Sequence, residues 1–363
     1  MKKVSVITMH RIYNFGSILQ TYATQKIFEK HGFNCEIVDY VSPNRKKIPL
    51  FLDCPEVLKN NGMKRIVYYI AKVPSFVIKD ITFGRFINKY LNLSKRRYFS
   101  NDELLKHPPI ADYYVTGSDQ VWNSKYNAGI DKSFYLNYAD KNSTKIAFVA
   151  SFGNTHISDE ESKVIKPLIN EYSDISVRED SAVEILSSMG FNSECLIDPT
   201  LQISKEEWTK IASKKLVKEQ YLLLFLLYNE DNGASEYAKK VAKEKGLKIV
   251  KLSWELKKPI GIDKLFTHRC PQDFLSLFTY ADFVVTNSFH GVAFSINLNR
   301  QFAFVPRCEL NGRIESLLTL TELQEQKVID FDVIVPTIDY KNVNEILNNE
   351  RIKANYFLKK SLN

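Results

Sequence analysis

The sequence predicts an α/β protein made of two successive units, each built around a mostly parallel β-sheet. Short apolar runs rich in β-branched residues alternate with helical stretches, a pattern typical of βαβ units. The 363 residues correspond to about two domains at roughly 150 residues each. Between Asp198 and Lys218 the chain is charged and lacks a strand pattern, and a fresh series of strands and helices then begins.

The bulk composition narrows the class of protein. Hydrophobic residues make up 44% and charged residues 25% of the chain, which is ordinary for a globular protein. No apolar run approaches the ~20 residues of a membrane span, and the run within Met1–His10 is too short for a signal peptide. We therefore expect a cytoplasmic protein. The five cysteines form no CxxC pair and the six histidines no HxxxH spacing, so no metal site built from local motifs is expected.

The chain is basic, with a net charge of +8. This balance suits an anionic small substrate, an anionic membrane surface or nucleic acid. The lysines and arginines are scattered, and no signature of a nucleic-acid-binding module accompanies them. No nucleic-acid partner is therefore expected.

The first domain is predicted to cover residues 1–205. A buried strand at Val4–Met9 is followed by a helix at Ile18–His31, which ends at Gly32. The further strands predicted in this domain are Phe33–Tyr40, Tyr113–Thr116, Ser143–Ala150, Ile175–Val177 and Glu194–Ile197.

An insertion at about residues 43–110 interrupts this rhythm. Pro55–Ile81 and Phe83–Leu93 have a helical pattern rich in lysine and large apolar side chains. One interpretation is a helical pair packed on the edge of the sheet. The other is a basic amphipathic surface that rests on the inner face of a membrane or covers an acceptor site.

The second domain is predicted at residues 206–335, and 336–363 form a C-terminal helix, centred on Asn342–Leu358, that crosses back to the first domain. The elements predicted between them are strands Tyr221–Leu227, Leu247–Leu252, Asp282–Thr286 and Phe302–Pro306, and helices Ala234–Lys245, Pro271–Tyr280 and one from about Gly291. Two such series suggest Rossmann-like domains that face each other across a cleft.

Polar residues that follow the strands are the first candidates for ligand binding, because open α/β sheets bind ligands beyond the carboxyl ends of their strands. After the first strand come Asn14, Gly16 and Ser17 at a helix start, where free N–H groups suit an anion. Alternatively, Asn14 and Ser17 only form the turn and cap the N-terminus of the helix. The loop lacks GxGxxG and GxxxxGK[ST], so dinucleotide and P-loop signatures are missing.

The strand Tyr113–Thr116 leads into a second polar loop. It contains Gly117, Ser118, Asp119, Gln120 and Trp122. Asp119 is a candidate base for a hydroxyl, and Trp122 a platform for a sugar ring. Alternatively, Asp119 caps a helix and Trp122 belongs to the core. Ser151 is a further small polar residue directly after a strand.

An arginine and a histidine also follow predicted strands, as the polar residues above do. Arg178 follows a strand and precedes a helix, where its planar guanidinium suits a carboxylate or phosphate; a salt bridge to Glu179 or Asp180 is the alternative. His290 follows Ser288 and precedes Gly291 at the start of a helix beyond a buried strand. A histidine there is placed for acid–base work, although the helix dipole disfavours its protonated form. His10 is the second candidate histidine.

Taken together, four segments resemble the polysaccharide pyruvyl transferase family. They are Asn14-Phe15-Gly16-Ser17, Thr116 to Asn123, Ser176-Val177-Arg178-Glu179 and Asn287-Ser288-Phe289-His290-Gly291, in the same order and spacing over roughly residues 4–325. The resemblance implies a GT-B-like fold, with two Rossmann-like domains and a central cleft. It also implies transfer of the pyruvyl group of phosphoenolpyruvate onto a sugar of a cell-surface glycan, commonly as a cyclic ketal, with lipid-linked precursors as frequent acceptors.

The resemblance assigns roles to particular residues. His290 matches the family's catalytic histidine and Arg178 its donor-binding arginine. A third basic residue is expected downstream, with Arg307 favoured and Arg313 next. No metal or redox cofactor is implied. Two other functions stay open: a nucleotide-sugar glycosyltransferase of the same fold, and a non-catalytic glycan-binding relative.

Overall fold

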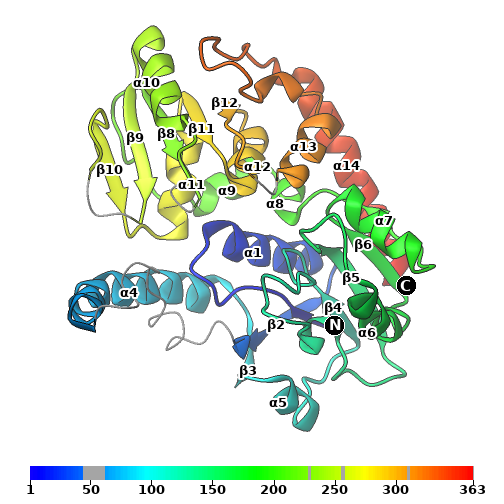
Figure 1. Cartoon of the computed structure of the whole chain (residues 1–363). Coiled ribbons are helices and arrows are strands. Elements are labelled where there is room, and N and C mark those ends of the chain that lie inside the picture. Colours follow the sequence, from blue (N-terminus) through cyan, green and yellow to red (C-terminus); the bar gives the residue numbers. More distant parts are fainter. Residues whose placement is uncertain (44–61, 228–229, 255–257, 309–310, 363) are drawn as a thin grey trace. The chain divides into compact units, whose positions relative to one another are not determined.

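The computed structural model describes residues 1–43, 62–227, 230–254, 258–308 and 311–362. The chain divides into two compact units, Met1–Cys195 with Ser361–Asn363, and Leu196–Lys360. Each unit contains one parallel β-sheet with helices around it (Figure 1). This confirms the predicted fold class, two Rossmann-like α/β units of the GT-B kind. The division falls after Cys195, whereas the predicted boundary follows residue 205.

The sheet of the first unit has the strand order β3-β2-β1-β4-β5-β6-β7, and its neighbouring strands run parallel. Its strands are β1 (Lys3–Ile7), β2 (Asn34–Tyr40), β3 (Leu93–Tyr98), β4 (Tyr113–Thr116), β5 (Thr144–Ala150), β6 (Asp174–Val177) and β7 (Glu194–Cys195). Its helices are α1 (Phe15–Lys30), α4 (Gly62–Tyr90), α5 (Asn101–Lys106), α6 (Asp159–Ile169) and α7 (Asp180–Ser188), with a 3-10 turn η2 (Lys132–Tyr135). The order of the strands reverses between β1 and β4, which makes this position the switch point of the sheet.

The centre of this unit is formed by β1 and α1. Val4 and Val6 in β1 are fully buried, as expected for a parallel strand covered on both faces. The helix begins at Asn14, whose side-chain oxygen accepts hydrogen bonds from the backbone N–H groups of Gly16 and Ser17. Asn14 therefore serves as the N-cap, and α1 starts at the carboxyl edge of the sheet with Ser17 in its first turn.

Among its described residues, the predicted insertion contains the long helix α4, the strand β3 and the short helix α5. α4 continues through Thr82, where two helices were predicted to meet, and the predicted start at Pro55 lies outside the described residues. Leu93–Tyr98, for which no strand was predicted, forms the edge strand β3. Its sequence LSKRRY shows no apolar alternation, and only Ser94 and Tyr98 are buried, because an edge strand needs few core contacts.

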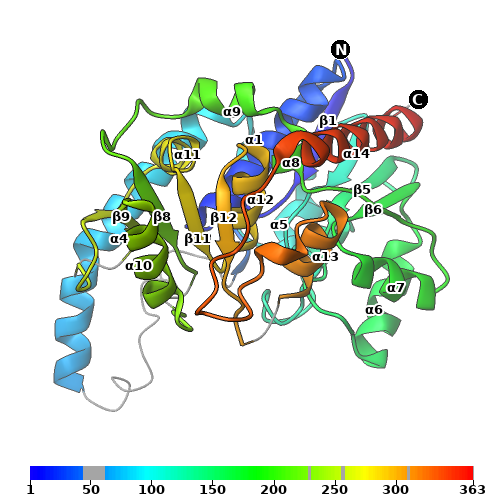
Figure 2. The ribbon, with the colours of Figure 1, turned by 90° about the horizontal axis from the view of Figure 1, so that it is seen from above.

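Helix α4 is attached to the first unit through its C-terminal half. Phe83 lies against Phe15 with ring centroids 5.3 Å apart, and Phe86 lies against Tyr22 at 6.1 Å. The N-terminal half extends away from the sheet of this unit (Figure 2). Within the described part of the chain, no helix is long and apolar enough to span a lipid bilayer.

The sheet of the second unit has the strand order β10-β9-β8-β11-β12, also parallel. Its strands are β8 (Tyr221–Phe225), β9 (Lys248–Ser253), β10 (Lys264–Thr267), β11 (Phe283–Thr286) and β12 (Gln301–Phe304). The helices are α8 (Pro199–Gln202), α9 (Lys205–Ile211), α10 (Ala234–Lys245), α11 (Pro271–Thr279), α12 (Phe289–Asn297), α13 (Gly312–Leu320) and α14 (Tyr340–Ser361), with a 3-10 turn η3 (Gln324–Gln326). Here the strand order reverses between β8 and β11.

The segment between Asp198 and Lys218, which lacks a strand pattern, contains two short helices. α9 begins with a capping box, in which Ser204 and Glu207 hydrogen-bond to each other's backbone N–H groups. At the other end of the unit, α14 contains the predicted helix Asn342–Leu358, and the carbonyl oxygen of Leu362 then accepts a hydrogen bond from the Tyr113 hydroxyl at 2.8 Å.

Candidate active site

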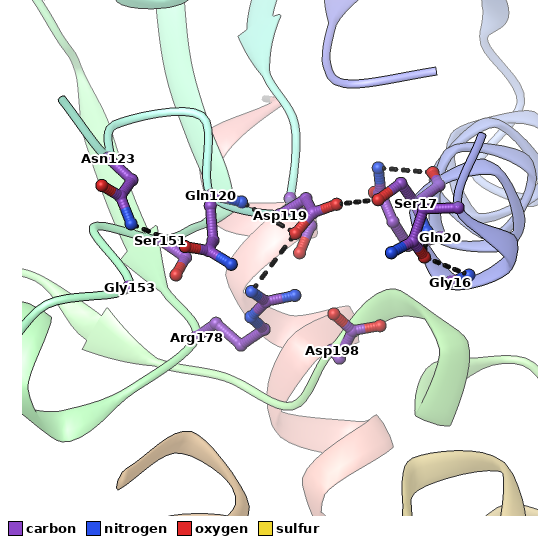
Figure 3. A network of polar contacts seen from close by, with 12 residues as sticks. Gly16, Ser17, Gln20, Asp119, Gln120, Asn123, Ser151, Gly153, Arg178 and Asp198 are labelled. Atoms are coloured by element: carbon purple, nitrogen blue, oxygen red, sulfur yellow. Dashed lines mark hydrogen bonds and ion pairs between the residues drawn. The ribbon is translucent and has the colours of Figure 1, made fainter. Parts of the chain in front are cut away.

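The first group of candidate residues lies at the switch point of the first sheet, between the loops that follow β1 and β4. The Ser17 hydroxyl donates a hydrogen bond to Oδ2 of Asp119, and the backbone N–H of Gln120 donates to Oδ1 of Asp119 at 2.9 Å. Figure 3 shows Asp119 between Ser17 and Arg178. The two loops predicted to bind ligands are thus joined through one buried carboxylate.

Arg178 lies next to this carboxylate. It follows β6, and its side chain is only 1% exposed. Its Nη2 lies 3.5 Å from Oδ1 of Asp119, and its Nε lies 3.9 Å from Oε2 of Glu179. The salt bridge to Glu179 that was the alternative interpretation is therefore present at the longer of the two distances, and Asp119 is the nearer partner.

Glu179 is a functional candidate that the sequence did not single out. Its Oε1 accepts three hydrogen bonds, from the Ser151 hydroxyl at 2.8 Å and from the backbone N–H groups of Phe152 and Gly153 at 3.0 and 3.1 Å. The carboxylate therefore fixes the loop after β5 beside Arg178. The sequence feature that could have identified Glu179 is its position directly after Arg178 at the end of a strand.

The backbone of this cluster is held in unusual conformations. Asp119 has a φ of 77° and Val149, near the end of β5, a φ of 59°. Positive φ is a genuine outlier for a β-branched residue, and such strain gathers at functional sites. Asp119 also forms an isolated parallel bridge with Ala150, so the two strained segments lie side by side.

Several predicted ligand residues of this unit have structural roles in the structure. Trp122 is 1% exposed; its indole N–H donates to the carbonyl of Phe134 at 3.1 Å, and its ring stacks on Tyr135. No face of this ring is open to a sugar, so the alternative of a core aromatic describes its position. Gly117 sits against Thr8, because a Cβ there would lie 3.0 Å from the Thr8 Cβ.

Gln120 and Ser118 are also engaged by protein groups. The side-chain oxygen of Gln120 accepts a hydrogen bond from Asn123 at 2.6 Å, and the carbonyl of Ser118 accepts one from the Thr8 hydroxyl at 2.7 Å. The groups of the first unit that combine burial, charge and a strand-end position are therefore Asp119, Arg178 and Glu179.

The second group lies at the switch point of the other sheet, where β8 and β11 end. Asn287 follows β11 and is buried. Its side-chain oxygen accepts from the N–H of Leu227 at 2.7 Å, and its Nδ2 donates to the carbonyl of Glu230 at 2.9 Å. One amide thus holds the loop after β8 against the loop after β11.

His290 lies in the first turn of α12 with 8% of its surface exposed. Ser288 is the N-cap, and its hydroxyl oxygen accepts from the N–H of Gly291 at 3.3 Å. A Cβ at Gly291 would lie 2.2 Å from Oγ1 of Thr286, closer than atoms can approach. Glycine is therefore required for α12 to begin this close to β11, and this close packing positions His290.

The two downstream arginines differ in their surroundings. Nε and Nη2 of Arg307 each lie 2.8 Å from a carboxylate oxygen of Glu230, and this hydrogen bonding lowers the pKa of Glu230. Arg313, in the first turn of α13, has its guanidinium 5.8 Å from the ring centroid of Phe289, the neighbour of His290. Arg178 belongs to the first unit, and His290, Arg307 and Arg313 belong to the second.

His10, the second candidate histidine, lies in a different buried cluster. Its side chain is fully buried, with Nε2 3.3 Å from Oδ1 of Asp39. Arg11 binds both oxygens of Asp39 at 2.7 and 2.8 Å, and Arg97 binds one at 2.9 Å. Burial raises the pKa of Asp39, but the hydrogen bonds from His10 and the two arginines outweigh it, so the net pKa is lowered. These contacts are those of a structural ion cluster.

In the described ranges, no three side chains of histidine, cysteine, aspartate or glutamate gather closely enough to hold a metal ion. The candidate groups are instead cations, carboxylates and a histidine at the carboxyl ends of parallel strands. Two Rossmann-like units with charged and polar groups at their switch points define a class of α/β protein that binds ligands beyond the carboxyl ends of its strands.

A comparison with protein-family models identifies the family within this class. The model described as polysaccharide pyruvyl transferase matches residues 14–309, which is most of the chain. The chain therefore belongs to the polysaccharide pyruvyl transferase family, a family of transferases in polysaccharide biosynthesis. The matched range contains Asp119, Arg178, His290 and Arg307 but ends before Arg313. A comparison with curated proteins finds no match.

Solved structures similar to this chain are distant in sequence. A putative UDP-N-acetylglucosamine 2-epimerase from Listeria monocytogenes is 12% identical, with a TM-score of 0.49, and the similarity covers 98% of this chain and 90% of that one. The UDP-GlcNAc 2-epimerase from Methanocaldococcus jannaschii is 13% identical at a TM-score of 0.48, covering 95% and 92%. MurG from Acinetobacter baumannii is 12% identical at 0.40, covering 98% and 95%.

Substituting Gly291 with alanine should destabilise the second unit. The added methyl group collides with Thr286, and overpacking of this kind costs about 1–3 kcal/mol. The matched control is Gly312→Ala in the first turn of α13, where nothing lies within 4 Å of the new Cβ. Thermal unfolding should show a lowered midpoint for G291A and an unchanged or raised one for G312A. Equal midpoints would contradict the packing role of Gly291.

The stability of the chain should fall below about pH 6.5 because of His10. Burial lowers the pKa of His10, the hydrogen bond to Asp39 opposes this, and nearby Arg11 adds to the lowering. The unfolded chain then binds a proton that the folded chain does not, so stability is complete above the unfolded pKa of ~6.5 and falls by up to about 1.4 kcal/mol per pH unit below it. In urea unfolding, His10→Gln should remove this slope between pH 7 and pH 5. If the free energy of unfolding changes with pH in the same way in the original chain and in His10→Gln, the assigned role of His10 is refuted.

Proposed function

We propose that this protein transfers the pyruvyl group of phosphoenolpyruvate onto a sugar of a cell-surface polysaccharide or its lipid-linked precursor. The product is a ketal, and phosphate is released. The proposal rests on the family match together with one observation, the buried guanidinium of Arg178 at the switch point of the first sheet. A buried arginine at a strand end is a preformed partner for a carboxylate or phosphate.

The donor carries both a carboxylate and a phosphate, so more than one cation is needed to hold it. Arg307 is the favoured second cation, since it lies within the range that matches the family, and the donor would compete with Glu230 for its guanidinium. Arg313 is the next candidate, with its guanidinium 5.8 Å from the ring centroid of Phe289. The N–H groups at the start of α12 add a favourable dipole for an anion.

Asp119 is our candidate base for the acceptor hydroxyl. Without donor, its Oδ1 lies 3.5 Å from Nη2 of Arg178. A donor carboxylate that takes its place on Arg178 would leave this oxygen of Asp119 to accept the proton of the acceptor hydroxyl. The hydrogen bond from Ser17 keeps the carboxylate in position during this exchange.

His290 is the proposed acid–base group on the donor side. A proton is added to the methylene carbon of the donor, which leaves an oxocarbenium-like centre at the adjacent carbon. One acceptor hydroxyl adds to that centre, the bond to phosphate breaks, and a second hydroxyl closes the ketal. The two acceptor hydroxyls lose two protons in total. In the overall reaction, the methylene carbon gains one proton and becomes a methyl group, and the released phosphate gains the other. Because α12 disfavours a charged histidine at its start, the negative donor must stabilise the protonated form.

No cofactor takes part in this scheme. The protein would act in the cytoplasm, where it meets its donor and the lipid-linked acceptor at the inner face of the membrane. Among possible donors, a screen by thermal stabilisation separates the proposal from a nucleotide-sugar glycosyltransferase. Stabilisation by phosphoenolpyruvate supports the proposal, and stabilisation by nucleotide sugars alone contradicts it.

Replacing His290 with glutamine should lower turnover by about 10²–10⁴-fold, the usual contribution of a general acid or base. The measurement is phosphate release from phosphoenolpyruvate in the presence of a glycan acceptor. His156→Gln, at an exposed position, is the matched control and should keep full activity. A His290→Gln variant that is folded and fully active would rule out the acid–base role.

The pair formed by Arg178 and Asp119 predicts opposite effects on donor binding. Titration of phosphoenolpyruvate without acceptor should show weaker binding to Arg178→Gln by about 1.5–3 kcal/mol, the range for a lost charged hydrogen bond. Asp119→Asn should bind the donor at least as tightly as the original chain, because a competitor for Arg178 is removed, while its turnover falls.

The double variant R178Q/D119N keeps the local charge balance and controls for misfolding of the single arginine variant. Arg307→Gln and Arg313→Gln in the same titration rank the two downstream arginines. Unchanged donor affinity in Arg178→Gln, or restored affinity in the double variant, would contradict direct binding of the donor by Arg178.

A further inference from the structure

Helix α4 has two apolar faces, and only one of them is covered by the first unit. The covered face includes Phe83, Phe86 and Ile87, which are at most 3% exposed. Phe76 extends this face toward the N-terminus, with its ring centroid 5.5 Å from that of Tyr13. These contacts hold the helix against the first unit. They bury only part of the apolar surface of α4.

The other face carries a row of exposed apolar side chains, which we call the apolar stripe. It consists of Met63, Ile66, Ile70, Val73, Val77 and Ile81, each between 43% and 79% exposed. Their spacing of three and four residues places them along one side of the helix, over about 27 Å at 1.5 Å per residue. A continuous exposed apolar surface of this kind marks an interaction site.

The charges of α4 indicate what covers this stripe. By sequence the helix contains six basic residues, Lys64, Arg65, Lys72, Lys79, Arg85 and Lys89, and one acidic residue, Asp80. Asp80 accepts a hydrogen bond from the Tyr13 hydroxyl at 3.1 Å, so it is engaged by the loop that follows β1. A basic helix with an apolar side complements an anionic lipid surface.

A second copy of the chain is the rival partner, because the same spacing occurs in coiled coils. Two copies of α4 paired along their stripes would bring together two helices with six basic residues and one acidic residue each. Like charges on paired helices repel, which disfavours this pairing. The whole chain, at +8, adds to the repulsion.

We infer that the apolar stripe of α4 docks the protein onto the surface of a membrane that contains anionic phospholipid. The helix lies in the plane of the surface with the stripe among the headgroups and upper acyl chains, and its basic residues bind lipid phosphates. Docking is independent of the reaction, but if the proposed function holds, it brings the first unit to lipid-linked acceptors.

The test is sedimentation with vesicles of phosphatidylglycerol mixed with phosphatidylcholine, compared with vesicles of phosphatidylcholine alone. We expect stronger binding to the anionic vesicles, and weaker binding at high salt. The triple variant Ile66→Gln, Ile70→Gln and Val73→Gln should bind them at least about tenfold more weakly, because three apolar side chains no longer enter the lipid.

The matched control places the same three glutamines at exposed apolar positions elsewhere, Ile110, Ile260 and Ile329, which are 85%, 94% and 86% exposed. Both triple variants should unfold at the temperature of the original chain, and the control should keep its vesicle binding. Equal vesicle binding by the stripe variant and the original chain, or no binding by either, would overturn the inference. If the original chain forms a dimer in the absence of lipid and the stripe variant is a monomer, the apolar stripe instead binds a second copy of the chain.

An activity measurement separates this inference from the proposed function. With a water-soluble glycan acceptor, the stripe variant should release phosphate as fast as the original chain. With a lipid-linked acceptor in anionic vesicles, it should be slower by a factor similar to its loss of binding. If neither acceptor supports phosphate release while vesicle binding follows the stripe, the proposed function fails and the docking surface stands.

Discussion

The reversal of strand order in each sheet is the constraint on which the candidate site depends. Neighbouring strands whose connections leave in opposite directions open a gap between their loops at the carboxyl edge. In the first unit this gap lies between β1 and β4, where Ser17 meets Asp119. In the second it lies between β8 and β11, where Asn287 joins the two loops. Groups far apart in sequence therefore meet at these two points because of topology.

Burial gives the charges at the first switch point their particular character. Arg178 lies within 4 Å of the carboxylates of Asp119 and Glu179, and its side chain is almost inaccessible to water. A buried charge without partners is costly, so the resting state must compensate each of these groups internally. Glu179 does so mainly through the loop after β5, and Asp119 through Ser17 and the N–H of Gln120. The contact of Arg178 with Asp119, at 3.5 Å, therefore joins a cation after β6 to a carboxylate that is fixed by the loops after β1 and β4.

The sequence predicted regular elements well where packing dictates their pattern. The bounds of β4 and α10 agree with those observed, because buried strands and amphipathic helices carry their own periodicity. β3 was missed because its charged residues face solvent at the edge of the sheet. For the site, positions after strands located Asp119, Arg178 and His290. Their pairings, and the core position of Trp122, depend on contacts between distant segments, which no local pattern contains.

The hydroxyl of Tyr113 links Lys2 and Leu362, which are far apart in sequence, within the first unit. It accepts a hydrogen bond from Lys2 at 2.9 Å and donates one to the carbonyl of Leu362 at 2.8 Å. The second unit is thus a continuous excursion that leaves the first unit after Cys195 and returns at Ser361. Two crossings of the chain, one after Cys195 and one before Ser361, therefore join the units, so neither unit is made of a chain segment that the other merely follows.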